Sequence, residues 1–501
     1  MNLKYIENKQ LPPLAWCAVI SKKSETVEVT AGCMVECMEN GFVSGVWDGD
    51  FQKLDLENTL YLCCSGGYIY ERGGVKFTTP THPQESIFAI KVCDRLFVSN
   101  SLPFVLTMAN ERLDANYYNY EYDLCSSILG YEKFVKRSPL YSGNKLQIFR
   151  CARVSVDRNL NTSEEEQRPI FPMDDFKQYK ASVLGVLRRI VENGQSPTRK
   201  HQYGLISTIS RGYDASATSA LVKEVGCNTT LSLIAPVKYL SDDGRDIARI
   251  MGYENILTGD GEAFKKCEHF EEAMYLCSGT SGMTFYCFEK NTAGNILFEG
   301  ERGDSMWERL NPNVNDRLDF SWGNGIAQSA VGGEQYLHNN TIKIDVPLIG
   351  CQQWTDVQRI SHSEEMKPWV VREHYDRPIA RRLVEEKGVG REDFGRAKMG
   401  AGIALRFETL KSLSRKMSPK SHADLLSWYN RLKRDRLREV MAYLKYYKSE
   451  FPMYANYAFS KIHLKFRIRS KSVGWYSSPT QQLLILWANE KMIDKYKKYL
   501  Q

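Results

Sequence analysis

A polar turn at residues 210–216, with the sequence SRGYDAS, has the residue types of a phosphate-binding loop. It follows the apolar run QYGLISTIS and leads into DASATSALVKEVG, so it is expected to join the end of a strand to the start of a helix. Unpaired N–H groups and the helix dipole at such a position favour an anion. Gly212 lets the backbone approach that anion closely, and Ser210 and Ser216 carry hydroxyls that can donate to phosphate oxygens. Asp214 would repel a phosphate unless a cation lay between them, so the turn predicts Mg²⁺ shared by this carboxylate and a nucleotide.

The segments around this turn alternate between helical and extended patterns. A helix is expected over residues 174–194, with Asp174 or Asp175 as its N-cap. The runs QYGLISTIS and TTLSLIAP are typical of buried strands, and DASATSALVKEVG and DDGRDIARIMG of helices that end at glycine. Strands that alternate with helices predict a parallel sheet covered on both faces, with ligands at the carboxyl ends of its strands.

The pattern differs on either side of this region. Residues 16–156 alternate short β-rich runs with Gly, Asn and Asp turns, and the Ser-Gly-Gly at 65–67 is expected to form a hairpin turn. Charge then rises and apolar periodicity is lost, which predicts a linker, and from about residue 372 the pattern becomes helical. The predicted division is a β-rich domain at 1–156, a linker at 157–172, an α/β domain at 173–405 and a helical C-terminal extension at 406–501.

Composition is typical of a globular protein without membrane spans, disulfides or a transition-metal site. The chain has 501 residues, 43% of them hydrophobic, and it contains no apolar run near the roughly 18 residues of a membrane span. No secretory signal is recognisable, so we expect a cytoplasmic protein whose 13 cysteines are reduced and which makes no membrane contact. The chain has no CxxC pair and no HExxH motif, so no transition-metal site is expected.

The net charge of +7 is unevenly distributed. Residues 411–501 hold 20 Lys and Arg against 6 Asp and Glu, a net charge of +14, so the remaining residues sum to −7. Such a segment could bind nucleic acid, an anionic substrate or an acidic carrier. We favour the other interpretation, in which this segment is the solvated basic face of a helical subdomain.

Two turns resemble those of one enzyme family. The turn SRGYDAS is similar to the SGGxDS turn of PP-loop ATP pyrophosphatases, which cleave ATP between its α and β phosphates, with Arg211 in place of a glycine. NILFEGERGDSMWERL, at residues 295–310, resembles the second loop of the asparagine synthetase branch, SGDGxDE. Gly300, Gly303 and Asp304 match that loop, and Ser305 stands where Glu is usual. The resemblance implies that Asp304 is a second Mg²⁺ ligand, opposite Asp214.

Two later segments match the same family in the same order. SEEMKPW resembles its E-x-R-x-P-F element, with Glu364 and Pro368 in place and Met366 instead of arginine, and FGRAKMG resembles its R-x-K element through Arg396 and Lys398. Residues 85–110 are similar to part of the family's N-terminal domain. The resemblance implies an α+β glutaminase-like (Ntn-type) sandwich followed by an α/β parallel-sheet PP-loop synthetase domain.

The glutaminase reaction of the family is not expected. Its nucleophile is a cysteine directly after the initiator Met, and Asn2 occupies that position here. Cys17 resembles this N-terminal cysteine at a position further along the chain, where cleavage before it would expose its α-amine. A cysteine in a buried strand is the ordinary interpretation. Relatives similar to β-lactam synthetases and lasso-peptide cyclases also lack glutaminase activity and use an amine already present on the substrate. Ammonia is the other candidate nucleophile.

The resemblance therefore implies an ATP-dependent, AMP-forming carbon–nitrogen ligase. It would adenylate a small-molecule or peptide carboxylate and transfer the acyl group to an amine, with ATP and Mg²⁺ bound. The implied ATP and pyrophosphate contacts are Ser210, Arg211, Gly212, Asp214, Ser216, Leu233, Ile234 and Gly300, with Mg²⁺ on Asp214 and Asp304. The implied catalytic residues are Lys398, which would neutralise pyrophosphate and an oxyanion, and Glu364 with Glu301, which would deprotonate the amine.

Two alternatives stay open from the sequence. One is a PP-loop enzyme that modifies RNA or a nucleoside, for which the basic C-terminal segment would supply affinity. The other is a non-catalytic ATP-binding scaffold, because Arg211, Ser305 and Met366 depart from the family's pattern. The sequence also leaves a homodimer open.

Overall fold

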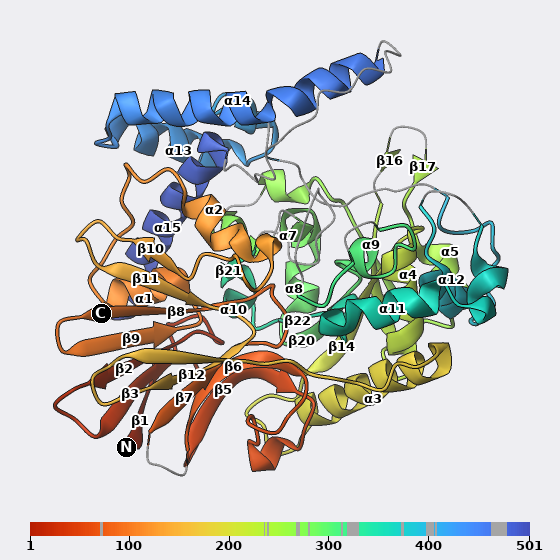
Figure 1. Cartoon of the computed structure of the whole chain (residues 1–501), viewed down its shortest axis with the longest axis horizontal. Helices are drawn as coiled ribbons and strands as arrows, with labels where there is room; N and C mark the ends of the chain where they lie inside the picture. The colour runs from red at the N-terminus through yellow and green to blue at the C-terminus, as the bar shows by residue number, and fades with distance from the viewer. Residues whose placement is uncertain are drawn as a thin grey trace.

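The molecule is described here from a computed structural model. The residues that it describes are 1–70, 74–234, 236–237, 240–266, 271–278, 281–311, 314–317, 330–371, 375–396, 405, 408–461 and 478–501. Figure 1 shows a mostly-strand N-terminal part beside a parallel sheet with helices, and C-terminal helices along one edge. No helix among these residues is both long enough and apolar enough to cross a membrane.

The N-terminal part consists of two sheets packed face to face (Figure 1). Trp16, Ala18 and Ile20 alternate along one strand and are fully buried between the sheets, as expected for a strand with one face in the core. The Trp16 ring lies 5.0 Å from that of Phe42 and 6.0 Å from that of Phe77, both on the opposite sheet. The seven-stranded sheet has the order β1 (Asn2–Glu7), β3 (Thr26–Ala31), β2 (Trp16–Ser21), β9 (Arg95–Ser99), β8 (Ile87–Val92), β11 (Lys145–Phe149), β10 (Arg137–Pro139). The six-stranded sheet has the order β13 (Thr162–Glu166), β12 (Ala152–Val156), β7 (Val75–Thr78), β6 (Leu62–Ile69), β5 (Gly41–Trp47), β4 (Glu36–Met38).

Two details of this part differ from the sequence-based expectation. The Ser-Gly-Gly at 65–67 lies inside β6 rather than in a hairpin turn. Gly66 is needed there because a Cβ would come within 2.1 Å of the Phe42 carbonyl oxygen on β5. Within the predicted linker, residues 162–166 form β13, an edge strand paired with β12. Its Thr-Ser-Glu-Glu-Glu sequence resembled a linker because an edge strand with four exposed residues has no apolar alternation.

The predicted parallel sheet is confirmed. Five strands, all parallel, take the order β18 (Asn255–Gly259), β15 (Thr229–Leu233), β14 (Gly204–Ile209), β20 (Asn295–Glu299), β22 (Ile342–Asp345). Both faces are covered, because along β20 the side chains of Ile296 and Phe298 join one apolar cluster while Leu297 joins another with Phe288. The helix before β14 is α3 (Phe176–Gly194), and Asp175 caps it by accepting from the Gln178 N–H, as predicted.

The strand order reverses direction between β14 and β20. The chain moves from β14 to β15 and β18 on one side, and then returns past β14 to β20 and β22 on the other. In open α/β sheets the carboxyl ends of strands at such a reversal bound the ligand site. The turn after β14 leads into α4 (Tyr213–Lys223), and the turn after β20 leads into α9 (Gly303–Met306), so both predicted turns lie at this position.

The C-terminal helices α13 (Pro419–Arg431), α14 (Arg436–Lys461) and α15 (Pro479–Tyr499) are not a separate extension (Figure 1). Helix α15 packs on α1 (Leu102–Met108) of the N-terminal part, where the Tyr496 and Phe104 rings stack at 4.8 Å. The Tyr496 hydroxyl also donates to Glu334 at 2.7 Å. The end of the chain is therefore part of the core that joins the two regions.

Shorter elements complete the fold. The α-helices are α2 (Tyr120–Cys125), α5 (Arg245–Ile250), α6 (Glu271–Tyr275), α7 (Ser281–Thr284), α8 (Glu289–Thr292), α10 (Glu334–His338), α11 (Trp354–Ser361) and α12 (Pro378–Glu385). The 3-10 helices are η1 (Phe51–Lys53), η2 (Ser126–Leu129), η3 (Ala263–Lys266), η4 (Phe285–Phe288), η5 (Val346–Leu348), η6 (Cys351–Gln353), η7 (Glu364–Trp369) and η8 (Ser412–Arg415). Two ribbons pair β16 (Pro236–Val237) with β17 (Leu240–Ser241), and β19 (Cys277–Ser278) with β21 (Ala330–Gly333).

Candidate functional site

The two predicted turns are in contact at the carboxyl edge of the parallel sheet. A Cβ at Gly300 would lie 2.4 Å from the carbonyl carbon of Asp214, and a Cβ at Gly303 would lie 2.5 Å from the Asp214 carboxylate oxygen Oδ1. Real Cβ atoms do not approach other atoms so closely, so glycine at both positions is what allows the second turn to rest against Asp214. The structure thus brings Asp214, Gly300 and the turn that carries Asp304 together.

Arg377 binds the Asp214 carboxylate, a contact that no local sequence pattern predicts. Its Nη1 donates to Asp214 Oδ1 at 2.5 Å and to Oδ2 at 2.6 Å, and its Nε donates to Glu308 Oε2 at 3.2 Å. The Arg377 side chain is 2% exposed. Burial alone would lower the pKa of this guanidinium, but the carboxylates of Asp214 and Asp304 outweigh it and raise the pKa above its usual range.

Three acids surround the Arg377 guanidinium. Asp214 and Glu308 accept hydrogen bonds from it, and the charge of Asp304 helps to raise its pKa. Carboxylate oxygens are the ligands that Mg²⁺ prefers. A carboxylate has about four lone-pair sites, so Asp214 keeps acceptor capacity while it binds Arg377. We refer to these four residues as the strand-end cluster.

The 210–216 turn is held by its own side chains. Ser216 is fully buried, and its hydroxyl donates to the Ser210 carbonyl oxygen at 2.6 Å. The Gly212 N–H donates to the Ser210 Oγ at 3.0 Å. The Arg211 N–H donates to Asp242, and its guanidinium lies 3.6 Å from Asp246 on α5. Ser210, Arg211 and Ser216 therefore fix the shape of the turn in this structure, and Arg211 ties it to the next strand-to-helix connection.

Leu233 and Ile234 lie at the carboxyl end of β15, next to β14. Leu233 pairs with Gly259 on β18, and the Ile234 N–H donates to the Gly259 carbonyl oxygen at 2.9 Å. The Ile234 side chain is exposed. These residues border the same edge of the sheet as the strand-end cluster.

Glu301 belongs to a buried ionic network beside that cluster. The Lys343 ammonium lies 3.3 Å from Glu299 and 3.0 Å from Asp345, and it also donates to Glu301. The carboxylate oxygens of these three acids lie within 4.8 Å of one another. Since the ammonium contacts all three, Lys343 supplies the positive charge that a metal ion would otherwise bring to this network.

Burial sets the protonation of the network. Burial raises the pKa of Asp345 to about 8, with the charges of Glu301 and Glu299 adding to the effect and Lys343 opposing it. Burial would also raise the pKa of Glu301, but Lys343 and Arg302 bring it below its usual value. Glu301 is therefore a carboxylate of this network that stays ionised, and its lowered pKa weakens its affinity for a proton.

Glu364, another predicted catalytic residue, does not join the strand-end cluster. Glu364 is at the start of η7 with its side chain 85% exposed, and it pairs with Lys367 at 2.5 Å rather than with the strand-end cluster. Lys398 lies outside the described residues. Cys17 is fully buried within β2, and burial raises the pKa of its thiol above the usual range, as for an ordinary core cysteine. Every cysteine among the described residues is a free thiol.

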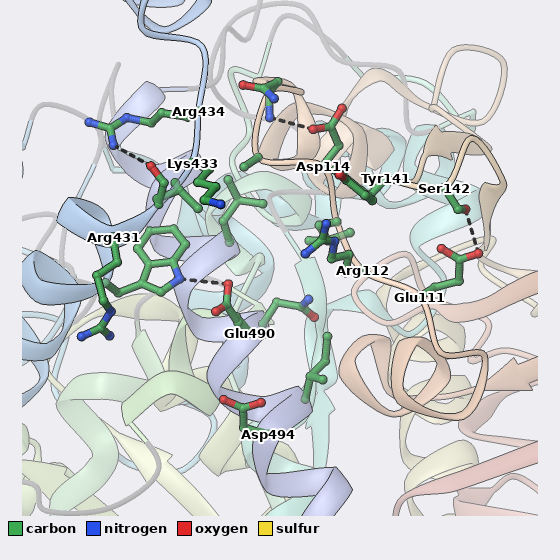
Figure 2. A pocket seen from close by; sticks show the side chains of 18 of the residues that line it. Glu111, Arg112, Asp114, Tyr141, Ser142, Arg431, Lys433, Arg434, Glu490 and Asp494 are labelled. Atoms are coloured by element: carbon green, nitrogen blue, oxygen red, sulfur yellow. Dashed lines mark hydrogen bonds between the residues drawn. The ribbon is translucent and has the colours of Figure 1, made fainter.

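A separate groove of about 1100 Å³ lies between the N-terminal part and the C-terminal helices. Figure 2 shows Arg112 and Tyr141 on one wall and Arg431, Lys433 and Arg434 on the other. The Arg112 guanidinium stacks 3.7 Å above the Tyr141 ring. The lining also includes four acids, Glu111, Asp114, Glu490 and Asp494, so the groove is mixed in charge rather than a basic channel.

Several cations of the basic segment are paired inside the fold. Arg434 bonds Glu439 at 2.7 Å with both side chains buried, Lys491 lies 2.7 Å from Asp424, and Lys495 lies 3.2 Å from Glu272. These pairs account for part of the excess of Lys and Arg that the sequence concentrates there.

The sequence-based reasoning missed Asp345, Arg377, Lys343, Glu299 and Glu308, and they differ in how they could have been found. Asp345 ends a buried strand, so the rule that drew attention to Asp214 and Asp304 could have found it. Arg377 and Lys343 carry no such signal, since each is one basic residue among many until the chain folds. Comparison with models of known families and with curated proteins finds no match for this chain.

Proposed function

We propose that this protein is an ATP-dependent ligase that forms an amide bond and releases AMP and pyrophosphate without hydrolysing glutamine. The observation that carries the proposal is the contact of two acid-bearing turns at the reversal of strand order, with Gly300 and Gly303 resting on Asp214. Such a reversal is where open α/β sheets bind nucleotides. The motif resemblance supplies the reaction class.

The proposed reaction has two steps. A substrate carboxylate oxygen attacks the α-phosphorus of ATP, the bond to the β-phosphate oxygen breaks, and pyrophosphate leaves an acyl-adenylate behind. An amine nitrogen then attacks the acyl carbon, the bond to the adenylate oxygen breaks, and AMP leaves. The amine loses one proton in forming the amide, and a base must accept it.

Asp214 and Asp304 would hold a Mg²⁺ ion, which when bound screens the charge of the ATP phosphates. Arg377 orients the Asp214 carboxylate through its two hydrogen bonds. Glu301 is the proposed proton acceptor, as the motif resemblance implies, and Lys343 and Arg302 keep it ionised while they lower its affinity for a proton. The N-terminus of α4 lies at the turn after β14, where it favours the anionic phosphates.

A second candidate is a scaffold that binds ATP without turning it over. The observation that favours it is the engagement of both Asp214 oxygens by a buried arginine. In the proposed ligase the Arg377–Asp214 ion pair coexists with Mg²⁺, whereas in a scaffold Arg377 would take the place of Mg²⁺. The two candidates therefore differ in their dependence on Mg²⁺.

The test measures ATP binding and ATP cleavage separately. Binding of a fluorescent ATP analogue is titrated with and without Mg²⁺, and AMP and pyrophosphate are then measured with pools of carboxylates and amines. Asp214→Asn and Asp304→Asn should each abolish Mg²⁺-dependent binding and AMP release, while Asp94→Asn, at an exposed ion pair with Lys23, should not. ATP-analogue binding that is unchanged by Mg²⁺, without AMP release, would favour the non-catalytic scaffold. AMP formed only with added tRNA would favour an RNA-modifying enzyme.

A further inference from the structure

Helix α14 presents a regular row of apolar side chains to solvent. Leu437, Val440, Leu444, Tyr447 and Phe451 are 71%, 53%, 58%, 49% and 62% exposed. Their spacing alternates between three and four residues, which is the a and d pattern of a coiled-coil heptad. Figure 1 shows α14 along the outer edge of the molecule.

The opposite face of α14 is attached to the body of the protein. Glu439 is buried and accepts from Arg434 and from the Tyr429 hydroxyl, each at 2.7 Å. Tyr446 is also buried, and the Tyr443 hydroxyl lies 3.5 Å from that of Thr480 on α15. These contacts fix the rotation of the helix, so the apolar row faces outward because the other face is already used.

The charge beside the row is positive on balance. Between residues 436 and 451 the chain has Arg436, Arg438, Lys445 and Lys448, all exposed, against two carboxylates, Glu450 and the buried Glu439. A parallel second copy of α14 would offer Arg436 and Lys448 no carboxylate, because the facing positions are Met441 and Tyr443. The sequence at 462–477 of this chain would do the same, since it contains four Lys and Arg and no carboxylate.

We propose that this row is the docking surface for an acidic amphipathic helix of a partner protein. In the heptad that begins at Leu437, Arg436 falls at a g position and Lys448 at an e position, where they would pair with glutamates of the partner, while Glu450, at a later g position, would pair with a basic residue. The alternation of three and four residues is what knobs-into-holes packing requires, and an anionic membrane surface does not require it. This proposal does not depend on the proposed ligase activity.

The test uses two designed peptides of three heptads, each with Leu at a and d, one with Glu at e and g and the other with Lys. Fluorescence anisotropy measures their binding to the full chain. We expect the Glu peptide to bind and the Lys peptide not to bind. Leu444→Ser should weaken binding by about tenfold or more, whereas Leu60→Ser, at an exposed leucine outside α14, should leave it unchanged.

Charge reversal gives the sharper test. Arg436→Glu combined with Lys448→Glu should exchange the preference, so that the Lys peptide binds and the Glu peptide does not. The proposal is overturned if both peptides bind the unmodified chain equally, or if the reversal leaves the preference unchanged. It is also overturned if vesicles containing phosphatidylserine capture the chain while the Glu peptide does not, or if the chain forms a dimer that Leu444→Ser dissociates.

Discussion

Replacing Gly303 by alanine tests whether the second turn rests on Asp214. The new methyl would lie 2.5 Å from Asp214 Oδ1 and 2.7 Å from its Cγ, against about 3.5 Å for an ordinary contact. The carboxylate would have to move by about 1 Å, which takes it from 2.5 Å to the limit of hydrogen bonding with Arg377. We expect Gly303→Ala to lower the free energy of unfolding by about 1–3 kcal/mol.

Gly300→Ala should cost more. Its methyl would meet backbone atoms, the Asp214 carbonyl carbon at 2.4 Å and the Ala215 nitrogen at 2.6 Å, so α4 itself would have to move. The matched control is Gly185→Ala within α3, where the nearest atom is the flexible Arg189 Nη1 at 3.6 Å. Helix propensity predicts that this control raises stability by about 0.5–1 kcal/mol.

Urea unfolding followed by tryptophan fluorescence measures all three variants. If Gly303→Ala is as stable as the parent while Gly185→Ala is stabilised as expected, the second turn is not in contact with Asp214. If the ligase proposal also holds, Gly303→Ala should weaken Mg²⁺-dependent ATP binding beyond its effect on stability.

Three further perturbations follow from buried charges and hydroxyls. Arg377→Met should destabilise the protein by about 3–5 kcal/mol, because it leaves carboxylates without their cation, and adding Asp214→Asn should recover part of this loss in urea unfolding. Since the pKa of Asp345 is raised to about 8, the folded chain holds a proton that the unfolded chain has lost above about pH 4. The free energy of unfolding should therefore fall as pH rises from 4 to 8, by up to about 1.4 kcal/mol per pH unit, and Asp345→Asn should flatten that slope in urea midpoints. Tyr496→Phe should cost about 1–3 kcal/mol in thermal unfolding, because buried Glu334 loses a hydrogen-bond donor.

Controls distinguish these effects from general damage. Lys387→Met, at a partly exposed ion pair with Glu224, should change stability by less than about 1 kcal/mol, in contrast to Arg377→Met. Tyr499→Phe, on the last turn of α15 and only partly buried, should be nearly neutral. A pH profile of Asp345→Asn that matches the parent would show that Asp345 does not hold the proton.

Some features of the fold could be predicted because they depend on residues near one another in sequence. The apolar runs at β14, β15 and β20, each followed by a turn and a helix start, were enough to predict a parallel sheet with two acid-bearing turns at its edge. The Asp175 cap of α3 is equally local, since the capping oxygen and the N–H that it accepts from are three residues apart.

Other features depend on contacts between residues distant in sequence, which the periodicity of apolar residues does not predict. Gly66 needs to be glycine because of the Phe42 carbonyl on the neighbouring strand, so the Ser-Gly-Gly resembled a turn until the pairing of β5 and β6 was known. Edge strand β13 was mistaken for linker because its exposed side chains leave no apolar pattern. The contact of α15 with α1 joins residues almost four hundred positions apart, and no pattern within either helix predicts its partner.

The candidate site divides in the same way. Local sequence patterns place Asp214 and Asp304 after strands, and therefore both acids at one edge of a sheet. The contacts of Gly300 and Gly303 with Asp214, the binding of its carboxylate by Arg377, and the buried acidic network around Lys343 became apparent from the folded chain alone. The physical reason is that strand and helix patterns follow from neighbouring residues, whereas the partner of a buried charge is set by whichever distant segment the fold places within hydrogen-bonding distance.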